Sequence, residues 1–142
     1  MDATDRRIVA LLRENARRSF SDIGTHVHLS APAVKRRLDR LERDGVVIGY
    51  TAVVDPEAFG WHAEAFVDLY CEGEMSGSAI KRAVQKEAGV VSAHTVAGEA
   101  SALLHVMAED TKSLELALER IRATQGVTRT VTEVVLSTLF TR

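Results

Sequence analysis

The chain has 142 residues, of which 46% are hydrophobic and 27% are charged, and this length suits one or two small domains. Its single cysteine, Cys71, excludes an internal disulfide framework and any cysteine-based zinc site. No run of 18 apolar residues occurs and no signal peptide precedes the first predicted helix, so we expect a cytoplasmic protein.

The formal net charge of −2 is distributed unevenly along the chain. Residues 1–50 contain 10 Lys and Arg against 7 Asp and Glu, whereas residues 51–142 contain 8 against 13. A basic N-terminal part attracts polyanions, and an acidic C-terminal part repels phosphates. We therefore expect any surface that faces a nucleic acid to lie within the first part.

Two helices are predicted at the start of the chain. The first spans about residues 4–15, and Asp2 and Asp5 have the spacing of a capping box at its start. The second is short, about residues 21–27, and it ends in a turn at residues 28–29. Each helix has an apolar face that is directed inward, and these faces are formed by Ile8, Leu11, Leu12, Ile23 and Val27.

A third, longer helix is predicted over residues 31–44. Ser30 precedes it, where a hydroxyl can accept hydrogen bonds from free backbone N–H groups, and Pro32 suits its first turn. Gly45 follows the last apolar position and suits a left-handed residue beyond the helix end. The helix directs one apolar stripe toward the core, formed by Val34, Leu38 and Leu41.

The opposite side of this third helix is basic, because Arg36, Arg40 and Arg43 lie away from the apolar stripe. A short helix, a turn, a basic helix and a strand that begins at residues 46–48 form a winged helix-turn-helix pattern, which most often binds DNA. The N-terminal end of such a helix usually enters the major groove. We predict DNA contacts from Ser30, Ala31, Pro32, Ala33, Lys35, Arg36, Arg37 and Arg40.

Two questions about the basic side stay open at this point. Arg36 and Arg40 suit either guanine edges or DNA phosphates. The whole side also has an alternative interpretation as a solvated surface, because Asp39, Glu42 and Asp44 are spaced to pair with neighbouring arginines. The two upstream helices and the following strand favour the interpretation as a DNA-binding domain.

The pattern changes after residues 51–61, which we interpret as a hinge strand and linker marked by Asp55, Pro56 and Gly60. Beyond it the order βαββαβ predicts a ferredoxin-like domain, so the fold class is α+β with helices on one face of an antiparallel sheet. The uncovered face would carry apolar side chains, so we expect a second copy to cover it, with two sheets facing each other. The predicted strands are 63–71, 90–96, 102–107 and 127–140, and the predicted helices are 78–88 and one from its cap Thr111 to Gly126.

Several ordered motifs run through nearly the whole chain. The first half contains Asp2-x-x-Asp5-x-x-Ile8, Asn15-Ala16-Arg17-Arg18-Ser19, Leu29-Ser30 and Arg37-x-x-Arg40-Leu41-Glu42-x-x-Gly45-Val46-Val47-x-Gly49-Tyr50. The second half contains Val96-Ala97-Gly98-Glu99, Leu103-Leu104-x-Val106 and Gly126-Val127-x-x-Thr130-x-Thr132. No single motif is diagnostic, but in this order they resemble the Lrp/AsnC family of feast/famine transcription regulators.

The resemblance implies a domain organisation and a set of partners. Residues 1–50 would be the winged helix-turn-helix, residues 51–61 the hinge, and residues 62–142 a ferredoxin-like domain for effector binding and oligomerisation. The chain would be a regulator that binds double-stranded DNA on the cytoplasmic nucleoid and responds to a small effector such as an amino acid. The resemblance also implies homodimers, which often assemble into octamers.

In this family a small amino acid binds against the loop after the second strand of the ferredoxin-like domain. A glycine turn exposes backbone N–H groups to a carboxylate, and threonine hydroxyls donate or accept hydrogen bonds. The family often has an aspartate three residues after the glycine, where Ser101 offers a neutral and weaker acceptor for an ammonium group. An ordinary β-turn is the alternative interpretation of this loop. The effector residues implied by resemblance are Gly98, Glu99, Ala100, Ser101, Thr130 and Thr132, with Gln125 from another subunit.

Other functions have less support from the residues. The five histidines lack metal-ligand spacing and no phosphate loop or nucleophile motif occurs, so we predict no metal, no cofactor and no enzymatic activity. An alternative is an enzyme like the tetrapyrrole (sirohaem) decarboxylases, some of which resemble this two-domain plan. Residues 89–110 contain no Lys or Arg to bind propionates, which disfavours that enzyme. A third interpretation is an architectural chromosome protein without an effector.

Overall fold

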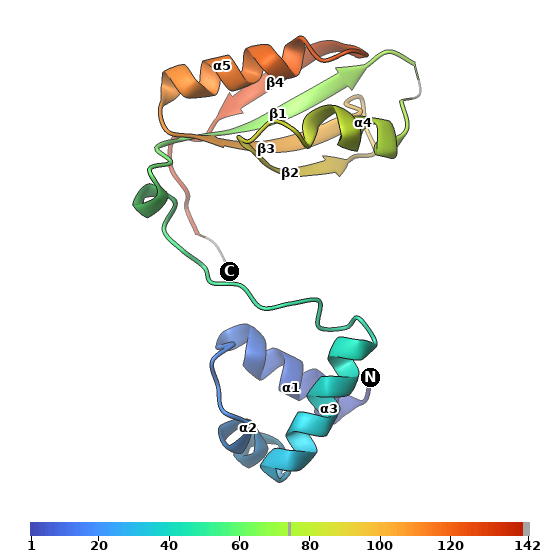
Figure 1. The fold of residues 1–142 in the computed structure, drawn as a ribbon, viewed down its shortest axis with the longest axis vertical. Coiled ribbons are helices and arrows are strands. Elements are labelled where there is room, and N and C mark those ends of the chain that lie inside the picture. Colours follow the sequence, from blue (N-terminus) through green and yellow to red (C-terminus); the bar gives the residue numbers. More distant parts are fainter. Residues whose placement is uncertain (74, 141–142) are drawn as a thin grey trace. The chain divides into compact units, whose positions relative to one another are not determined.

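The computed structural model describes residues 1–73 and 75–140, which form two compact units (Figure 1). The first unit is Met1–Val53 and the second is Val54–Arg142, so the division falls inside the segment 51–61. The final two residues of the predicted domain 62–142 lie outside the described residues. Each unit has its own hydrophobic core. No helix in the described part of the chain has both the length and the apolar character that crossing a membrane requires.

The N-terminal unit, whose residues are all described, contains the three predicted helices. They are α1 (Ala3–Glu14), α2 (Phe20–Val27) and α3 (Ala31–Arg43). The capping box of α1 is present, because the N–H of Asp5 donates to the Asp2 carboxylate at 2.8 Å and the N–H of Asp2 donates to the Asp5 carboxylate at 3.0 Å. The apolar faces of the helices meet in one core, formed by Ile8, Leu11, Leu12, Ile23, Val34 and Leu38.

The predicted wing strand is wrong. After Gly45, which has a φ of 69°, the backbone N–H groups of the next two residues both donate to the carbonyl of Leu41, at 2.9 and 3.1 Å. Residues 44–62 contain no strand, and their only regular element is a 3-10 turn, η1 (Pro56–Phe59), so the hinge strand predicted within 51–61 is also missing. A strand needs a partner for its backbone groups, and the residues of this unit provide no second strand.

The described part of the C-terminal unit is a four-stranded antiparallel sheet with two helices, in the predicted order βαββαβ. The strands lie in the order β2-β3-β1-β4, so β2 and β4 form the edges. Both helices pack their apolar side chains on the same face of the sheet, where they form one core (Figure 1). The elements are β1 (Ala63–Cys71), α4 (Gly77–Val84), β2 (Val90–Thr95), β3 (Ala102–Ala108), α5 (Thr111–Arg122) and β4 (Val127–Val134).

The last strand is shorter than predicted. The sequence predicts a strand over 127–140, whereas β4 ends at Val134. Its neighbour in the sheet is β1, and the final backbone hydrogen bond joins the N–H of Val135 to the carbonyl of Glu64, the second residue of β1, at 2.9 Å. Because β1 offers almost no backbone beyond this point, the described residues 136–140 continue without regular structure.

Several helix ends differ from the sequence prediction, and α5 ends at Arg122 rather than at Gly126. α4 ends at Val84 rather than at residue 88, and the chain then turns so closely past β3 that a Cβ on Gly89 would lie 2.9 Å from a backbone oxygen of that strand. Ser30 occupies the cap position of α3 but makes no side-chain capping bond. The cap of α5 is Asp110 rather than Thr111, because the Asp110 carboxylate accepts a backbone N–H three residues further on at 2.6 Å.

The face of the sheet that carries no helix is more polar than the sequence predicts. Residues alternate between buried and partly exposed along β1 and β3, which directs Glu64, Phe66 and His105 to this face. Nε2 of His105 lies 2.6 Å from a carboxylate oxygen of Glu64, and its ring stacks on Phe66 with 4.8 Å between the centroids. Val131 of β4 is on the same face and is 39% exposed. This open face therefore mixes apolar and ionisable groups.

The turn between α2 and α3 depends on a close approach at Gly24. A Cβ at this position would lie 2.3 Å from the carbonyl oxygen of Leu29, far inside contact distance. The N–H of Leu29 donates to the carbonyl of Gly24 at 3.0 Å, and His28 adopts a left-handed conformation with a φ of 56°. The geometry of the helix-turn-helix thus requires a residue without a side chain at position 24.

We expect Gly24→Ala to lower the free energy of unfolding of the N-terminal unit by about 1–3 kcal/mol, the usual cost of an overpacked site. Helix propensity alone predicts the opposite sign, because alanine is about 1 kcal/mol more favourable than glycine within a helix. Urea unfolding followed by circular dichroism measures the change. Ser21→Ala, on the exposed side of α2, is the control, and a Gly24→Ala protein as stable as this control would contradict the steric argument.

Candidate nucleic-acid interface and effector loop

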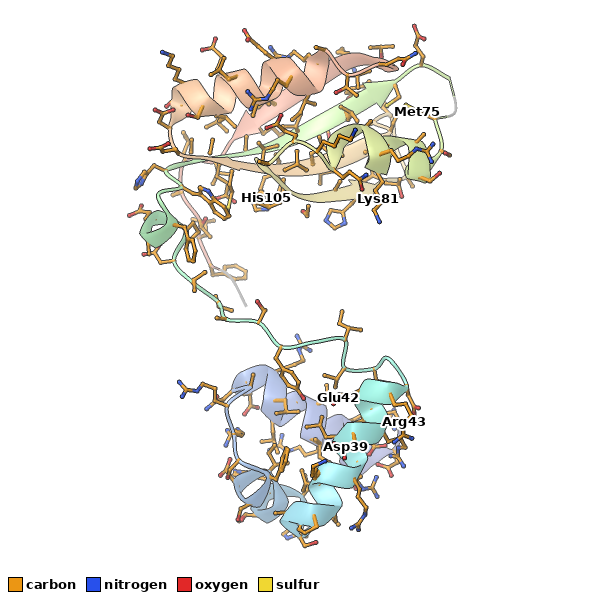
Figure 2. The ribbon with its side chains drawn as sticks, viewed as in Figure 1. Asp39, Glu42, Arg43, Met75, Lys81 and His105 are labelled. Carbon is orange, nitrogen blue, oxygen red and sulfur yellow. The ribbon has the colours of Figure 1, made fainter. Side chains whose placement is uncertain are left out.

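The exposed side of α3 presents free and paired cations. Arg36 and Arg43 are exposed and make no hydrogen bond or ion pair with any described residue. Nζ of Lys35 lies 2.6 Å from a carboxylate oxygen of Asp39, one turn further along the helix. Figure 2 shows Asp39 and Arg43 on this helix. Two guanidinium groups are therefore available to an external anion, one in the first half of α3 and one in its last turn.

Arg37 and Arg40 are held by the first turn of α1. Nη1 of Arg37 lies 2.6 Å from the Asp2 carboxylate and 2.8 Å from the Asp5 carboxylate. Nη2 of Arg40 donates to both oxygens of Asp5, at 3.0 and 2.8 Å. Asp5 is only 1% exposed, so its charge relies on these guanidinium groups and on the helix cap. We call these four residues the Asp5 cluster.

Hydrogen bonds keep both aspartates of the Asp5 cluster ionised. The backbone N–H of Asp5, followed by the guanidinium of Arg37, lowers the pKa of Asp2 to about 2. The backbone N–H of Asp2 lowers the pKa of Asp5 most, burial opposes this change, and Arg37 and Arg40 add to the lowering. The same carboxylates raise the pKa of Arg37. The cluster therefore consists of charged pairs at neutral pH.

The structure divides the eight predicted DNA-contact residues by role. Those at the start of α3 are small, with one exposed proline, and they are followed by the exposed Lys35 and Arg36. Arg37 and Arg40 instead each donate from one nitrogen to the carboxylate of Asp5. The sequence identified the aspartates only as helix caps, because links over 32 to 35 positions leave no periodic signal.

The predicted effector loop is tied to the end of β1. The N–H of Ser101 donates to the carbonyl of Leu69 at 2.8 Å, and the Ser101 hydroxyl accepts from the N–H of Cys71 at 3.1 Å. A hydroxyl that accepts one hydrogen bond can still donate its own hydrogen to a ligand. Glu99 is exposed, and Gly98 has open space where a Cβ would be. The loop thus presents a fixed hydroxyl beside an open glycine turn.

The other predicted effector residues lie across β1 from the loop. Thr130 is the β4 partner of the residue whose carbonyl binds Ser101, and its hydroxyl accepts from Nε of Arg122 at 3.0 Å. The buried hydroxyl of Thr132 has no hydrogen-bond partner among the described residues. Gln125 borders a separate hollow of about 520 Å³. The structure therefore gathers most of these residues at one end of the sheet, but the hollow at Gln125 does not include the loop.

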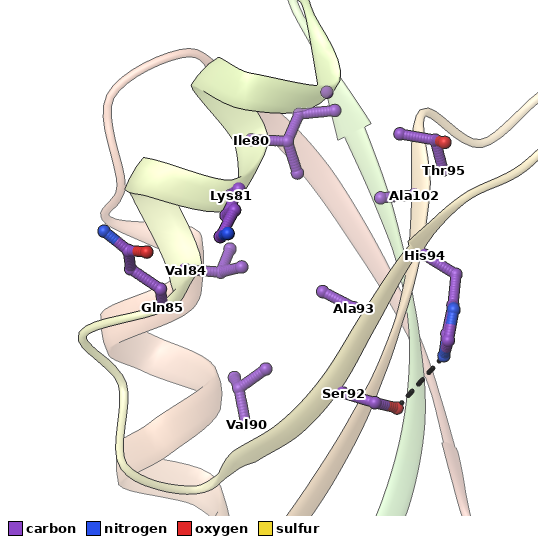
Figure 3. A pocket seen from close by; sticks show the side chains of 11 residues that line it. Ile80, Lys81, Val84, Gln85, Val90, Ser92, Ala93, His94, Thr95 and Ala102 are labelled. Atoms are coloured by element: carbon purple, nitrogen blue, oxygen red, sulfur yellow. Dashed lines mark hydrogen bonds between the residues drawn. The ribbon is translucent and has the colours of Figure 1, made fainter. Parts of the chain in front are cut away.

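A groove of about 580 Å³ lies between α4 and the edge strand β2 (Figure 3). Ile80 and Val84 of the helix form one apolar wall, and Lys81 adds a cation beside it. The groove reaches Thr95 and Ala102, which flank the effector loop, but none of the seven predicted effector residues lines it. It is therefore a neighbour of the predicted site and not a part of it. Among the described residues, no three His, Cys, Asp or Glu side chains are grouped to bind a metal ion.

Two family models match separate parts of the chain. An AsnC-type helix-turn-helix domain matches residues 1–42, and an Lrp/AsnC ligand binding domain matches residues 64–142. Over 142 residues the chain is 49% identical to the HTH-type transcriptional regulator Rv2324 of Mycobacterium tuberculosis, which covers 100% of this chain and 96% of that protein. It is also 36% identical over 140 residues to the HTH-type transcriptional regulator LrpA of the same organism, which covers 99% of this chain and 93% of that protein.

A solved structure shares both the sequence similarity and the fold. The feast or famine regulatory protein Rv3291c from M. tuberculosis, complexed with L-methionine, matches with a TM-score of 0.91 at 36% identity. The match covers 99% of this chain and 95% of that one. It therefore includes the helices of the first unit as well as the sheet and helices of the second.

The Asp5 cluster predicts a loss of stability in acid. A carboxyl whose pKa is lower in the folded than in the unfolded chain stabilises the fold above the unfolded pKa of about 4, and this contribution disappears as the pH falls toward the folded pKa. We expect Asp5→Asn to lower the free energy of unfolding by about 1–3 kcal/mol at pH 6, because charged donors lose their acceptor. Urea unfolding at several pH values should show the difference from wild type shrinking as the pH falls below about 4.

The control for this experiment is Asp39→Asn, which removes a carboxylate from the exposed pair with Lys35. This control should change the stability much less at pH 6, because exposed ion pairs contribute little. A difference between wild type and Asp5→Asn that stays constant down to pH 2 would show that the ionised carboxylate is not what stabilises α1 against α3.

Proposed function

The chain belongs to the Lrp/AsnC family of transcriptional regulators, and we propose that it is a DNA-binding regulator whose activity responds to an amino acid. The observation that carries this proposal is the exposed basic side of α3, which follows a tight turn and bears the unpaired Arg36 and Arg43. The first 50 residues are basic and the rest are acidic, which also supports DNA binding by the N-terminal part of the chain. Relatives named as transcriptional regulators support a regulatory rather than a catalytic role.

We propose that α3 is the recognition helix and that its first turn enters the major groove. The small side chains from Ser30 to Ala33 allow the helix backbone to approach base edges closely. Lys35 and Arg36, on the following turn, are exposed and long enough to reach either bases or phosphates. A regulator of this kind works on the chromosome, so we propose that it acts in the cytoplasm on the nucleoid.

We propose that the effector is an amino acid held by the loop from Gly98 to Ser101. A related structure holds L-methionine, and the open glycine turn beside a donor hydroxyl suits the carboxylate of such a ligand. A second copy would complete the site by bringing its Gln125 and neighbouring backbone to the loop. Within one copy Gln125 lines a hollow that does not include the loop, so a contact between Gln125 and the loop would come from a second copy.

We further propose that two copies associate through the open face of the sheet, and that such dimers assemble further into octamers. Phe66 and Val131 expose apolar surface on this face, which a partner sheet would cover. Glu64 and His105 on the same face already contact each other, which lowers the cost of burying this pair. Asp68 and Glu133 share the face, and a second copy would have to offer them polar partners. The effector then acts by shifting the geometry or assembly of the copies, which alters the spacing of their recognition helices.

Fluorescence anisotropy on labelled DNA tests the regulator and its effector together. We expect salt-sensitive binding to a duplex from upstream of the protein's own gene, tighter than to a scrambled duplex. Amino acids, beginning with L-methionine, should change this affinity for the wild type. Ser101→Tyr should abolish the response while leaving DNA binding itself intact, because the bulky ring fills the loop.

Ser101→Ala is the matched variant, because it removes the hydroxyl without adding bulk. It should weaken the amino-acid response by about fivefold, corresponding to one lost hydrogen bond of about 1 kcal/mol. Equal amino-acid responses in the wild type and both variants would remove Ser101 from the effector site. Absence of even salt-sensitive, non-specific binding by the wild type would contradict the proposed role of α3.

Val131→Asp should convert the protein to a smaller species in sedimentation velocity experiments. The substitution places an unpaired carboxylate on the open face at the edge strand β4, where burial against a second sheet would be costly. The control is Leu116→Asp on α5, because Leu116 is also partly exposed but lies away from the open face. An unchanged sedimentation coefficient for Val131→Asp would exclude this face as the dimer interface.

A further inference from the structure

Three arginines of α3 surround one hollow at the protein surface. Arg36, Arg37 and Arg40 line it together with Leu29 and Ala33, and its volume is about 360 Å³. No carboxylate lines this hollow. Positions 36, 37 and 40 lie within about one helical turn, which brings their guanidinium groups together. A site bordered by three guanidinium groups and no acid favours an anion.

Two of these guanidinium groups are fixed from behind by a buried carboxylate. Arg37 uses only Nη1 and Arg40 uses only Nη2 to bind the Asp5 cluster. A guanidinium has five N–H donors, so each arginine keeps Nε and one further nitrogen for another acceptor. No described residue occupies those nitrogens. Asp5 therefore holds both side chains in place while leaving donors free, and this reduces the entropy that they lose on binding a ligand.

The charged groups around the hollow leave one net positive charge, which a ligand with a single negative charge would neutralise. Arg36, Arg37 and Arg40 carry three positive charges, and the two aspartates of the Asp5 cluster offset two of them. A phosphodiester carries one negative charge and presents two oxygens, which suits paired N–H donors of arginine. Reading a base edge would instead require a guanidinium extended into the groove, whereas Arg37 and Arg40 are drawn back toward α1.

We propose that this hollow seats one backbone phosphate of DNA, that Arg36 closes on it, and that Asp5 is the residue that positions Arg37 and Arg40 for it. The inference rests on the proposed DNA-binding function and deepens it, because it assigns these arginines to the sequence-independent part of the contact. Phosphate contacts of this kind fix the position of a recognition helix on the duplex. Sequence selectivity then falls to other groups of α3.

Removal of the Asp5 charge gives the sharpest test, because two effects predict opposite signs. Asp5→Asn makes the protein more positive, so long-range electrostatics alone predicts tighter binding to DNA. Loss of the positioning carboxylate predicts weaker binding, by about three- to tenfold on any duplex, because two arginines become mobile. Asp39→Asn removes the same charge from α3 without touching the hollow, and it should bind DNA as tightly as the wild type or more tightly.

The salt dependence of binding to a scrambled duplex tests the phosphate seat itself. Arg36→Gln should reduce the slope of log K against log salt by about 0.9, the value for one lost phosphate contact on B-DNA. Arg36 makes no bond within the described residues, so this substitution leaves the fold undisturbed. Arg7→Gln, an exposed arginine of α1, removes the same charge outside the hollow and should leave the slope close to that of the wild type.

The outcomes separate this inference from the proposed function. Weaker DNA binding by Asp5→Asn, with helical circular dichroism retained, together with the reduced slope for Arg36→Gln, supports the seat. Tighter or unchanged binding by a folded Asp5→Asn overturns the positioning role. Equal slopes for Arg36→Gln and Arg7→Gln overturn the seat even if Asp5→Asn does not fold. A wild-type protein that binds no duplex at low salt overturns the proposed function instead, and the inference with it.

Discussion

One buried carboxylate joins the two helices on which the N-terminal unit depends. Asp5 closes the capping box of α1 and at the same time receives Arg37 and Arg40 of α3. A carboxylate that is 1% exposed would be costly without such partners, so α1 cannot keep its charged cap unless α3 lies where these arginines reach it. The apolar core sets the distance between the helices, and the ion pairs restrict the direction in which the basic side of α3 faces.

Local patterns predicted most of the fold, and distant pairings account for the rest. The spacing of Val34, Leu38 and Leu41 predicted the third helix, and β1 was predicted with its observed limits because a turn of polar residues and glycine follows its apolar side chains. Residues 46–48 and 135–140 were predicted as strand because they are rich in β-branched and apolar side chains. Neither segment finds enough partner backbone in the described chain, and the composition of a segment contains no information about its partners.

The candidate site was predicted only in outline, for the same reason. Arg36, Arg37 and Arg40 were all predicted to contact DNA, and only contacts with residues more than 30 positions away distinguish the free side chain from the two fixed ones. Gly24 escaped notice because its role depends on a carbonyl in the next turn. The effector loop came from resemblance rather than from spacing, and the bond between Ser101 and the backbone of Cys71 appears only in the folded sheet.

In the proposed dimer, the mixed character of the open sheet face has a consequence for which chains associate. Two related regulators occur together in M. tuberculosis, so one cell can contain several chains of this family. Purely apolar faces would associate with little discrimination, since apolar contact is non-directional. Polar positions such as Glu64 and His105 would penalise a foreign sheet that places no hydrogen-bonding partner opposite them. Within a family of nearly identical folds, this face would allow a chain to pair with its own copies rather than with related chains. Its polar positions would then diverge between paralogues faster than the core beneath them.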